Sequence, residues 1–435
     1  MPASLLTVDR DRLAAAARRV MARCDELARV TATPGAIERV YLSPEHARVN
    51  RLAAEWMREI GMTPRQDAAG NQLGRIEPAG GDRFTPALML GSHLDTVPDA
   101  GRFDGIVGVL MALEVVRLLR IGPPDVRPAR VGLPFALEVV AFSDEEGTRF
   151  GKALLGSAAA AGDWDDSWWG LTDADGTTLR EAFREFGLDP GRIGEAARRP
   201  DELVGYLEAH IEQGPELDER EESLAIVSSI ASARRFQVVV EGEARHAGGT
   251  PYERRRDALL GASEAALAIE RICRAEHHVI GTVGQLEAFP GAVNIVPGEA
   301  RFSLDLRGEF DGTRDRVWNA ISQELDEIMG WRRLRWRARE VHSAPAVFCA
   351  PLLQDVVREG ILSTLPSGAD DPAVIFSRAG HDGMAMSSVA DVGMLFLRNP
   401  DGISHHPDEL VSAGDVALGI RALAESVLQL AADRA

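Results

Sequence analysis

The side chains best suited to chemistry stand at the ends of apolar runs. His93 directly follows the run at residues 86–91, which predicts a buried strand. Because ligands of an open parallel sheet gather beyond the carboxyl ends of its strands, His93 is expected at such a site. Asp95, two residues on, could orient the imidazole by accepting its other N–H. Asp104 precedes a predicted helix at residues 106–119 and, taken alone, is better explained as its N-cap.

Three consecutive acidic residues, Asp144-Glu145-Glu146, follow a second predicted strand at residues 136–142. Carboxylates at a strand end repel one another unless a cation lies nearby. A solvated surface is the alternative explanation. Since this run is expected at the same sheet edge as His93, two metal ions and one free carboxylate would account for the whole group.

Two further histidines are candidate ligands. His210 lies in an apolar and acidic segment, and His405 lies in a loop after the apolar run 392–397. A single histidine of this kind is more often structural than a ligand. Together with three residues named above, however, they supply five nitrogen and oxygen donors that suit divalent ions. Paired ions about 4 Å apart can generate a hydroxide nucleophile and polarise a carbonyl group. The five donors are His93, Asp104, Glu146, His210 and His405.

Composition restricts the function classes. A formal net charge of −19 argues against a nucleic-acid surface, which needs clustered Lys and Arg. Three cysteines far apart in the chain favour neither a disulfide framework nor a cysteine metal site, so a reducing, cytoplasmic compartment is expected. The sequence shows neither a signal-peptide pattern nor about 18 consecutive apolar residues, so no membrane association is predicted.

The order of predicted elements indicates an α/β fold in two parts. Strand, helix and strand over residues 86–142 predict a mostly parallel sheet. Residues 229–342 instead follow the ferredoxin-like order β-α-β-β-α-β, in which residues 279–287 are read as one strand. We therefore predict a discontinuous catalytic domain, residues 1–228 and 343–435, and an inserted α+β domain at 229–342.

In this order the motifs resemble those of the M20-type metallopeptidase/amidohydrolase superfamily. The similarity is to the branch of allantoate amidohydrolases, N-carbamoyl-L-amino-acid hydrolases and β-ureidopropionases. The matching stretches span nearly the whole chain, at residues 91–99, 103–105, 142–150, 206–215, 246–251, 294–298, 379–382 and 402–407.

The resemblance implies two divalent metal ions per subunit. Asp104 would bridge them, with His93 and His210 completing one site. Glu146 and His405 would complete the other. The metal itself (Mn, Zn, Co or Ni) is left open, because selectivity depends on geometry and supply.

The resemblance also assigns roles around the metals. Glu145 would be the general base, and residues 229–342 would be a lid that also forms a homodimer. His246, reaching from the partner subunit, would stabilise the oxyanion as a second catalytic residue. The substrate would be bound by His246, Asn294 and Arg307, with help from Gln213.

These implied roles predict an enzyme that cleaves the terminal ureido C–N bond of a small carboxylate, releasing ammonia and carbon dioxide. Allantoate is the preferred substrate, because residues 402–407 most resemble that subgroup; the pathway would then be purine catabolism. N-carbamoyl-L-amino-acid hydrolase or β-ureidopropionase is the alternative. A dipeptidase, an aminoacylase or a metal-free binding homologue is disfavoured, because every ligand position and Glu145 hold competent side chains. Many relatives carry glycine where this chain has Arg378, which could add an anion contact or point to solvent.

Overall fold

The computed structural model describes residues 9–121 and 133–434. The chain divides into two compact units. The first comprises Met1–Ser228, Phe348–Ile375 and Ala379–Ala435, and the second comprises Ser229–Val347 and Phe376–Arg378. The short segment Phe376–Arg378 therefore belongs to the second unit, although the sequence places it among residues predicted for the catalytic domain.

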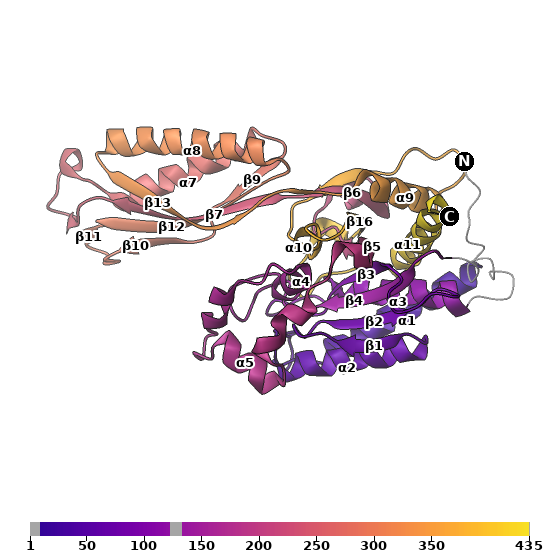
Figure 1. Cartoon of the computed structure of the whole chain (residues 1–435). Coiled ribbons are helices and arrows are strands. Elements are labelled where there is room, and N and C mark those ends of the chain that lie inside the picture. The colour runs from indigo at the N-terminus through magenta and orange to yellow at the C-terminus, as the bar shows by residue number, and fades with distance from the viewer. Residues whose placement is uncertain (1–8, 122–132, 435) are drawn as a thin grey trace. The chain divides into compact units, whose positions relative to one another are not determined.

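The first unit is built on a nine-stranded sheet that is parallel in its centre (Figure 1). The adjacent parallel strands are β4 (Ala136–Phe142), β3 (Ala87–His93), β5 (Leu203–Ile211) and β16 (Val392–Leu397). Every residue of β3, β4 and β16 is buried, which explains their continuous apolar sequences. The remaining strands are β1 (Thr63–Gln66), β2 (Gln72–Ile76), β6 (Leu224–Ile230), β14 (Val347–Phe348) and β15 (Val374–Ser377).

Helices cover this sheet. A group of four helices packs together: α1 (Arg10–Ala28), α3 (Ile106–Ile121), α9 (Pro351–Leu362) and α11 (Ala413–Asp433). Helix α2 (Pro44–Glu59) packs on β1 and β2. Shorter helices stand in the connections, namely α4 (Leu155–Ala161), α5 (Leu179–Phe186), α6 (Glu216–Glu219) and α10 (Gly383–Met386). The apolar faces of the longer helices and the central strands form one continuous core.

The second unit is an antiparallel sheet in the order β10-β12-β7-β13, with β9 also pairing β12. The strands are β7 (Ser232–Glu241), β9 (Val279–Thr282), β10 (Leu286–Phe289), β12 (Glu299–Gly308) and β13 (Arg335–Ala344), and a separate pair joins β8 (Arg245–His246) to β11 (Ile295–Val296). Helices α7 (Ala258–Arg274) and α8 (Asp311–Arg332) pack against the buried apolar side chains of this sheet. The predicted fold class, a mostly parallel α/β domain with a separate α+β domain, is confirmed.

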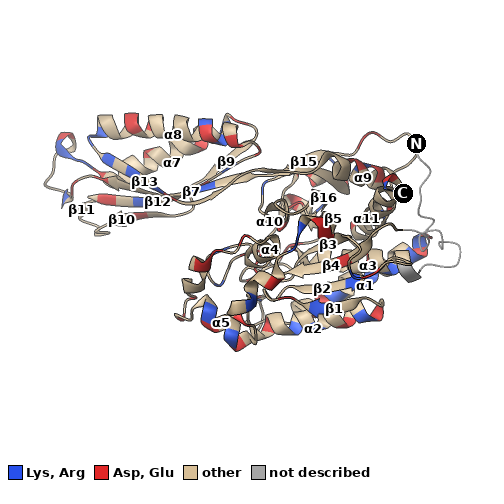
Figure 2. Ribbon diagram, in the orientation of Figure 1, with Lys and Arg blue, Asp and Glu red and all other residues tan. Residues whose placement is uncertain are grey.

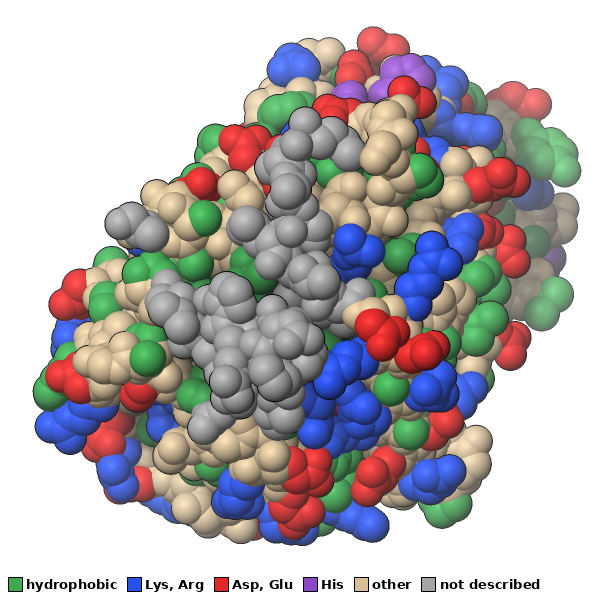
Figure 3. Space-filling view, turned by 90° about the vertical axis from the view of Figure 1, so that its right-hand side faces the viewer, with side chains coloured by type: hydrophobic (Ala, Val, Ile, Leu, Met, Phe, Trp, Pro, Cys, Tyr) green, Lys and Arg blue, Asp and Glu red, His purple; other side chains and the backbone are tan. Residues whose placement is uncertain are grey.

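The exterior is mixed in charge. Acidic and basic residues are interspersed along the helices and strands of each unit (Figure 2). The face in Figure 3 shows the same mixture wherever described residues reach it. Within the described ranges, residues 9–121 and 133–434, no helix is both long enough and apolar enough to cross a membrane.

Candidate metal centre

The four central parallel strands bring the predicted ligands to one edge of the sheet. Strand β3 ends at His93, and β4 ends two residues before the acidic run that starts at Asp144. Strand β5 ends one residue after His210, and His405 follows β16. This edge is the carboxyl end of the parallel strands, where loops can carry functional side chains on a rigid support.

Asp104 lies in the middle of the assembled group. Its Oδ1 is 3.3 Å from Nε2 of His210, and its Oδ2 is 3.1 Å from Nε2 of His405. The same His405 nitrogen is 3.3 Å from Oε1 of Glu146. Potential ligand atoms form three overlapping groups, each within 4.8 Å: His93, Asp104 and His210; His93, Glu145 and Glu146; and Asp104, Glu146 and His405. All five predicted ligands and Glu145 are thus brought together, and Asp104 belongs to two of the three groups.

The donor chemistry of this group fits divalent cations. All the converging atoms are imidazole nitrogens and carboxylate oxygens, the donors that zinc and manganese accept. Oε1 of Glu146 is buried, lies 3.3 Å from Nε2 of His405, and makes no hydrogen bond within the described part of the chain. Buried carboxylates of this kind are costly unless a cation balances them. We conclude that the residues present can hold metal.

Burial strongly affects the pKa values of the carboxyl groups in this group of residues. Burial raises the pKa of Glu145 well above its ordinary value, and the pKa of Glu146 is raised by burial and by the charge of Asp104. Burial would also raise the pKa of Asp104, but the His405 hydrogen bond and the charges of the neighbouring imidazoles hold it well below the usual range. A bound cation would favour the ionised form of all three carboxylates.

Backbone carbonyls orient the two buried imidazoles. Nδ1 of His210 lies 2.9 Å from the carbonyl oxygen of Ile211, so Nδ1 carries the proton and Nε2 accepts a hydrogen bond from the backbone N–H of Gly105 at 3.1 Å. Nδ1 of His93 lies 3.2 Å from the carbonyl oxygen of Asp95, whereas the Asp95 carboxylate is 3.6 Å away. The expected contact of His93 is therefore made mainly by the backbone of Asp95.

The Asp95 carboxylate instead holds the turn that carries the two glutamates. Its two oxygens accept hydrogen bonds from the backbone N–H groups of Glu145 at 3.2 Å and Glu146 at 3.1 Å. The turn begins with Asp144 in the left-handed region, at a φ of 62°. This conformation is costly for a residue with a side chain, and such strain persists where the surroundings impose it. Asp95 is thus a positioning residue for Glu145 and Glu146.

Two further side chains lock Asp104 in place. Glu409 accepts hydrogen bonds from the backbone N–H groups of Phe103 and Asp104 at 2.8 and 3.1 Å, and its other oxygen accepts from Ser404. Nε2 of Gln213 donates to Asp104 Oδ1 at 3.0 Å and to Ser404 at 3.1 Å. The sequence did not predict a role for Glu409, because no local pattern distinguishes one acidic residue in a polar loop from another.

Glycine is required immediately after Asp104. Gly105 has a φ of 65°, and a Cβ at this position would overlap the His93 imidazole. Gln213 and His405 also adopt left-handed conformations, at φ values of 57° and 55°. Backbone strain therefore gathers in the loops that carry the candidate ligands.

The predicted substrate residues of the second unit occupy two places. His246 pairs with Ile295 across β8 and β11, and the N–H of Ala247 donates to the carbonyl oxygen of Asn294 at 2.9 Å. His246 and Asn294 are therefore neighbours. Arg307 lies on β12, where its guanidinium donates to Asp305.

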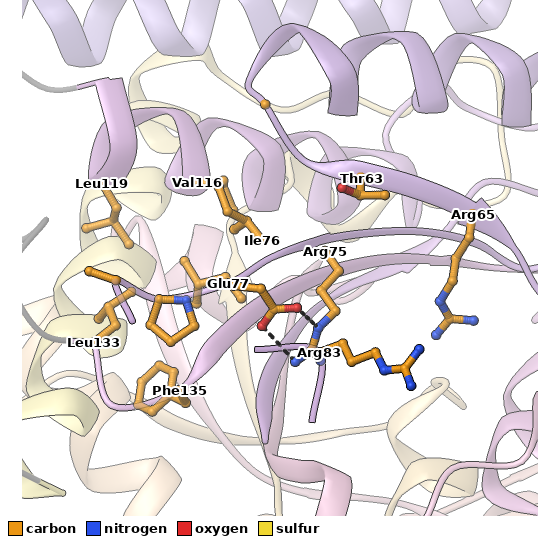
Figure 4. Close-up of a pocket in the computed structure, with 14 residues that line it drawn as sticks. Thr63, Arg65, Arg75, Ile76, Glu77, Arg83, Val116, Leu119, Leu133 and Phe135 are labelled. Atoms are coloured by element: carbon orange, nitrogen blue, oxygen red, sulfur yellow. Dashed lines mark hydrogen bonds and ion pairs between the residues drawn. The ribbon is translucent and has the colours of Figure 1, made fainter. Parts of the chain in front are cut away.

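A cavity of about 850 Å³ in the first unit contains none of the candidate ligands. Figure 4 shows apolar side chains, among them Val116 and Phe135, on one side and arginines on the other. The carboxylate there, Glu77, forms an ion pair of 2.7 Å with Arg75. The group of candidate ligands and this cavity are thus separate features of the fold.

The chain belongs to peptidase family M20/M25/M40, whose family model matches residues 89–429. It is 37% identical over 414 residues to an N-carbamoyl-L-amino acid amidohydrolase of Geobacillus stearothermophilus, covering 95% of this chain and 98% of the relative. It is 35% identical to an allantoate deiminase of Arabidopsis thaliana over 93% of this chain and 81% of that protein. Among solved structures, an amidase of the hydantoinase/carbamoylase family from Burkholderia multivorans matches with a TM-score of 0.84 and 30% identity, covering 95% of this chain and 98% of that one.

The predicted membership of this superfamily is thereby confirmed. The chain is an amidohydrolase, a hydrolase that acts on C–N bonds. Its substrate and the roles of its individual residues are taken up below.

Proposed function

We propose that this enzyme hydrolyses the terminal ureido group of a small carboxylate, with two divalent metal ions held by its strand-end ligands. The observation that carries the proposal is the position of Asp104, which belongs both to the group with His93 and His210 and to the group with Glu146 and His405. A carboxylate so placed could be a ligand to two cations, because it has two oxygens. Relatives named for ureido substrates match nearly the full chain, which supports the same reaction class.

The residues around the ligands supply proton transfer. When bound, the metal pair would lower the pKa of water and polarise the ureido carbonyl group. Glu145 would take a proton from the attacking water and deliver it to the leaving nitrogen. The C–N bond then breaks, ammonia leaves, and the carbamate that remains loses carbon dioxide. Asp95 would keep Glu145 in place through the backbone of the turn.

The second unit would bind the substrate. Asn294 offers an amide, and His246 would stabilise the developing oxyanion from the partner subunit. Arg307 presents a planar guanidinium suited to a carboxylate. Its orientation is set by Asp305 and by the carbonyl oxygen of Arg378, so little side-chain entropy would be lost on binding.

Allantoate remains the substrate predicted from residues 402–407, with N-carbamoyl-L-amino acids as the alternative. Relatives named for each activity match at 35% and 37% identity, so the names favour neither. Both compounds present a ureido group and a carboxylate, and both are compatible with the roles proposed here.

The first experiment is ammonia release by Mn-loaded enzyme from allantoate and from a panel of N-carbamoyl-L-amino acids. We expect turnover of at least one of them, and loss of that turnover after chelation, because the nucleophile depends on metal. Readdition of Mn is the control for irreversible damage. Full activity in the chelated, metal-free protein, or a metal-loaded protein inactive on every ureido compound, would contradict the proposal.

We also propose that the second unit forms a homodimer. Leu260 and Leu267, seven residues apart on α7 and so on one side of the helix, are 51% and 68% exposed. Strand β13 stands at an edge of its sheet, where a strand of a second copy could pair. The exposed leucines of α7 and the edge position of β13 are each features of a kind that symmetric contacts use.

Subunit complementation tests this arrangement. The Glu145→Gln and His246→Ala variants, each inactive alone, are mixed under conditions that exchange subunits. If His246 acts across the dimer, each heterodimer holds one complete site of two, and about a quarter of wild-type activity returns because about half of the dimers in an equimolar mixture are heterodimers. If His246 acts within its own subunit, no complete site forms and the mixture stays inactive. Sedimentation velocity provides the control, because a full-length monomer would rule out the proposal directly.

A further inference from the structure

A fully buried asparagine contacts both ends of the loop that carries the two glutamates of the candidate centre. Asn71 stands one residue before β2, and none of its side chain is exposed. Because Gln72 of β2 pairs with Ala141 of β4, Asn71 lies where β4 ends. The loop at residues 143–156 begins at this point and runs into the first turn of α4. The side chain of Asn71 is therefore placed to act on that loop.

The carboxamide of Asn71 bridges the two ends of the loop. Its Oδ1 accepts a hydrogen bond from the backbone N–H of Ser143 at 2.9 Å, and its Nδ2 donates to the carbonyl oxygen of Gly156 at 2.9 Å. The N–H of Gly156 donates in turn to the carbonyl oxygen of Ser143 at 2.9 Å. The fit is close, because a Cβ at Gly156 would overlap Oδ1 of Asn71. Three hydrogen bonds thus close a ring among these residues.

Asp67 fixes the orientation of this carboxamide. Nδ2 of Asn71 donates to Oδ2 of Asp67 at 2.8 Å. Burial raises the pKa of Asp67 to about 6, so its carboxylate is ionised above that pH and can only accept hydrogen bonds. The amino group of Asn71 must therefore face Asp67, which leaves the oxygen to face Ser143. Both N–H groups and the oxygen of the carboxamide have partners, and a buried network satisfied in this way is rigid.

The loop between the bridged ends is strained. Asp144 has a left-handed φ of 62°, and such a conformation persists only where the surroundings impose it. The N–H of Leu154 donates to the carbonyl oxygen of Asp144 at 2.7 Å, so the loop folds back onto its own start. Asp95 fixes the middle of the loop at Glu145 and Glu146, whereas the asparagine joins its ends. A displacement of about 1 Å in a catalytic group can cost about 10²-fold in rate.

We propose that Asn71 is a positioning residue for Glu145 and Glu146. Asp67 takes part by holding the carboxamide in the required orientation. The inference rests on the proposed function for the roles of the two glutamates, and it adds a support for them that is separate from Asp95. Loss of the bridge displaces the general base and the metal ligand together. It therefore lowers both kcat and metal affinity, and it leaves KM nearly unchanged because the proposed substrate residues lie on the second unit.

Three variants separate positioning from stability. Asn71→Ala removes the bridge. Asp67→Asn keeps the size of the side chain, but Oδ1 already accepts from the N–H groups of Ala69 and Asn71, so the new NH₂ group meets the NH₂ group of the carboxamide. The carboxamide then cannot satisfy residue 67 and Ser143 together. Tyr41→Phe is the matched control, because it removes a buried hydrogen bond to the carbonyl oxygen of Ala69 and leaves the bonds of Asn71 in place.

Hydrogen exchange and metal binding report on the loop without an activity assay. At pH 8, Asn71→Ala and Asp67→Asn should each raise the exchange rate of peptides covering residues 143–156 by about tenfold or more, since a buried N–H loses its acceptor. Calorimetric titration of Mn²⁺ into the metal-free, full-length proteins should give a dissociation constant raised by about tenfold or more in the same two variants. Tyr41→Phe should match the wild-type protein in both measurements.

Steady-state kinetics test the catalytic consequence. In both variants kcat for ureido hydrolysis should fall by about 10- to 10²-fold with KM nearly unchanged, whereas Tyr41→Phe should keep the wild-type kcat. A residue that only stabilised the fold would lower the melting temperature and leave kcat and Mn²⁺ affinity of the folded protein intact. If Asn71→Ala does not fold, Asp67→Asn decides the question by itself, because it changes no volume.

The outcomes distinguish this inference from the proposed function. Wild-type ureido turnover together with unchanged exchange, Mn²⁺ binding and kcat in Asp67→Asn would overturn the inference and leave the proposed function standing. An equal response in Tyr41→Phe would also overturn it, since the effect would then be one of stability. Faster exchange and weaker Mn²⁺ binding in Asp67→Asn, in a protein inactive on all ureido compounds, would keep the positioning role at the metal centre and overturn the proposed function.

Discussion

Glu145→Gln is expected to lower kcat by about 10²- to 10⁴-fold while leaving the bound metal in place. The amide has the shape of the carboxylate but cannot take a proton from water at neutral pH. The backbone N–H of Glu145, which Asp95 anchors, is unaffected by the substitution, so the turn should keep its conformation. Steady-state ammonia release and metal content by elemental analysis measure the two effects separately.

The adjacent glutamate provides the matched comparison. Glu145 and Glu146 both lie within 4.8 Å of a His93 nitrogen, so distance alone does not separate a base from a ligand. Glu146 also approaches His405 at 3.3 Å. We therefore expect Glu146→Gln to lose metal together with activity. If Glu145→Gln loses metal to the same extent, Glu145 is a ligand; if it remains fully active, Glu145 has no part in proton transfer.

Asp104→Asn is expected to abolish turnover, by about 10³-fold or more, because Asp104 would serve both of the proposed metal positions. The amide is neutral and has one oxygen, so it would bind one ion more weakly than the carboxylate does and lose its contact with the other. Metal content after gel filtration should fall for both ions, whereas a substitution in a single ligand group, such as His210→Ala, should spare one of them. Elemental analysis of the purified variants reads this difference without any assay of activity.

A structural control separates metal loss from misfolding. Asp25→Asn removes an exposed carboxylate that pairs with Arg102 in the first unit and should keep full metal and activity. The circular dichroism spectra of Asp104→Asn and wild-type protein should coincide, because the hydrophobic core of the unit does not include Asp104. An Asp104→Asn protein with a full complement of metal would show that Asp104 does not join the two sites.

Local sequence was sufficient to predict the edge at which the site forms. The continuous apolar runs before His93 and Asp144 predicted two strands, and β3 and β4 are buried at every position. A parallel strand covered on both faces must be apolar throughout, so its end is visible as the first polar residue. The placement of both segments at the carboxyl edge followed from that pattern.

Strand boundaries in the second unit required the tertiary structure. Residues 279–287 were predicted as one strand, but they form β9 and the start of β10, with a break between Thr282 and Leu286. Both strands pair with β12, and Ser303 on β12 donates its backbone N–H to Gln285 within the break. Hydrogen bonds to a partner distant in sequence decide where such a strand ends, and local composition does not report them.

Sequence by itself determined the chemical inventory of this protein: three histidines, an aspartate and two glutamates at strand ends, in the motif order of one family. Only the tertiary structure decided how they act on one another. It brought the Glu409 carboxylate within hydrogen-bonding distance of the Asp104 backbone N–H, although the two residues are more than three hundred positions apart in the sequence. It also placed the Asp95 carboxylate where it accepts a hydrogen bond from the turn that carries Glu145. It joined Arg307 to Asp305 and to the carbonyl oxygen of Arg378. The reason is physical: residue type is a local property, whereas burial, pairing and charge balance depend on segments that meet only in the folded chain.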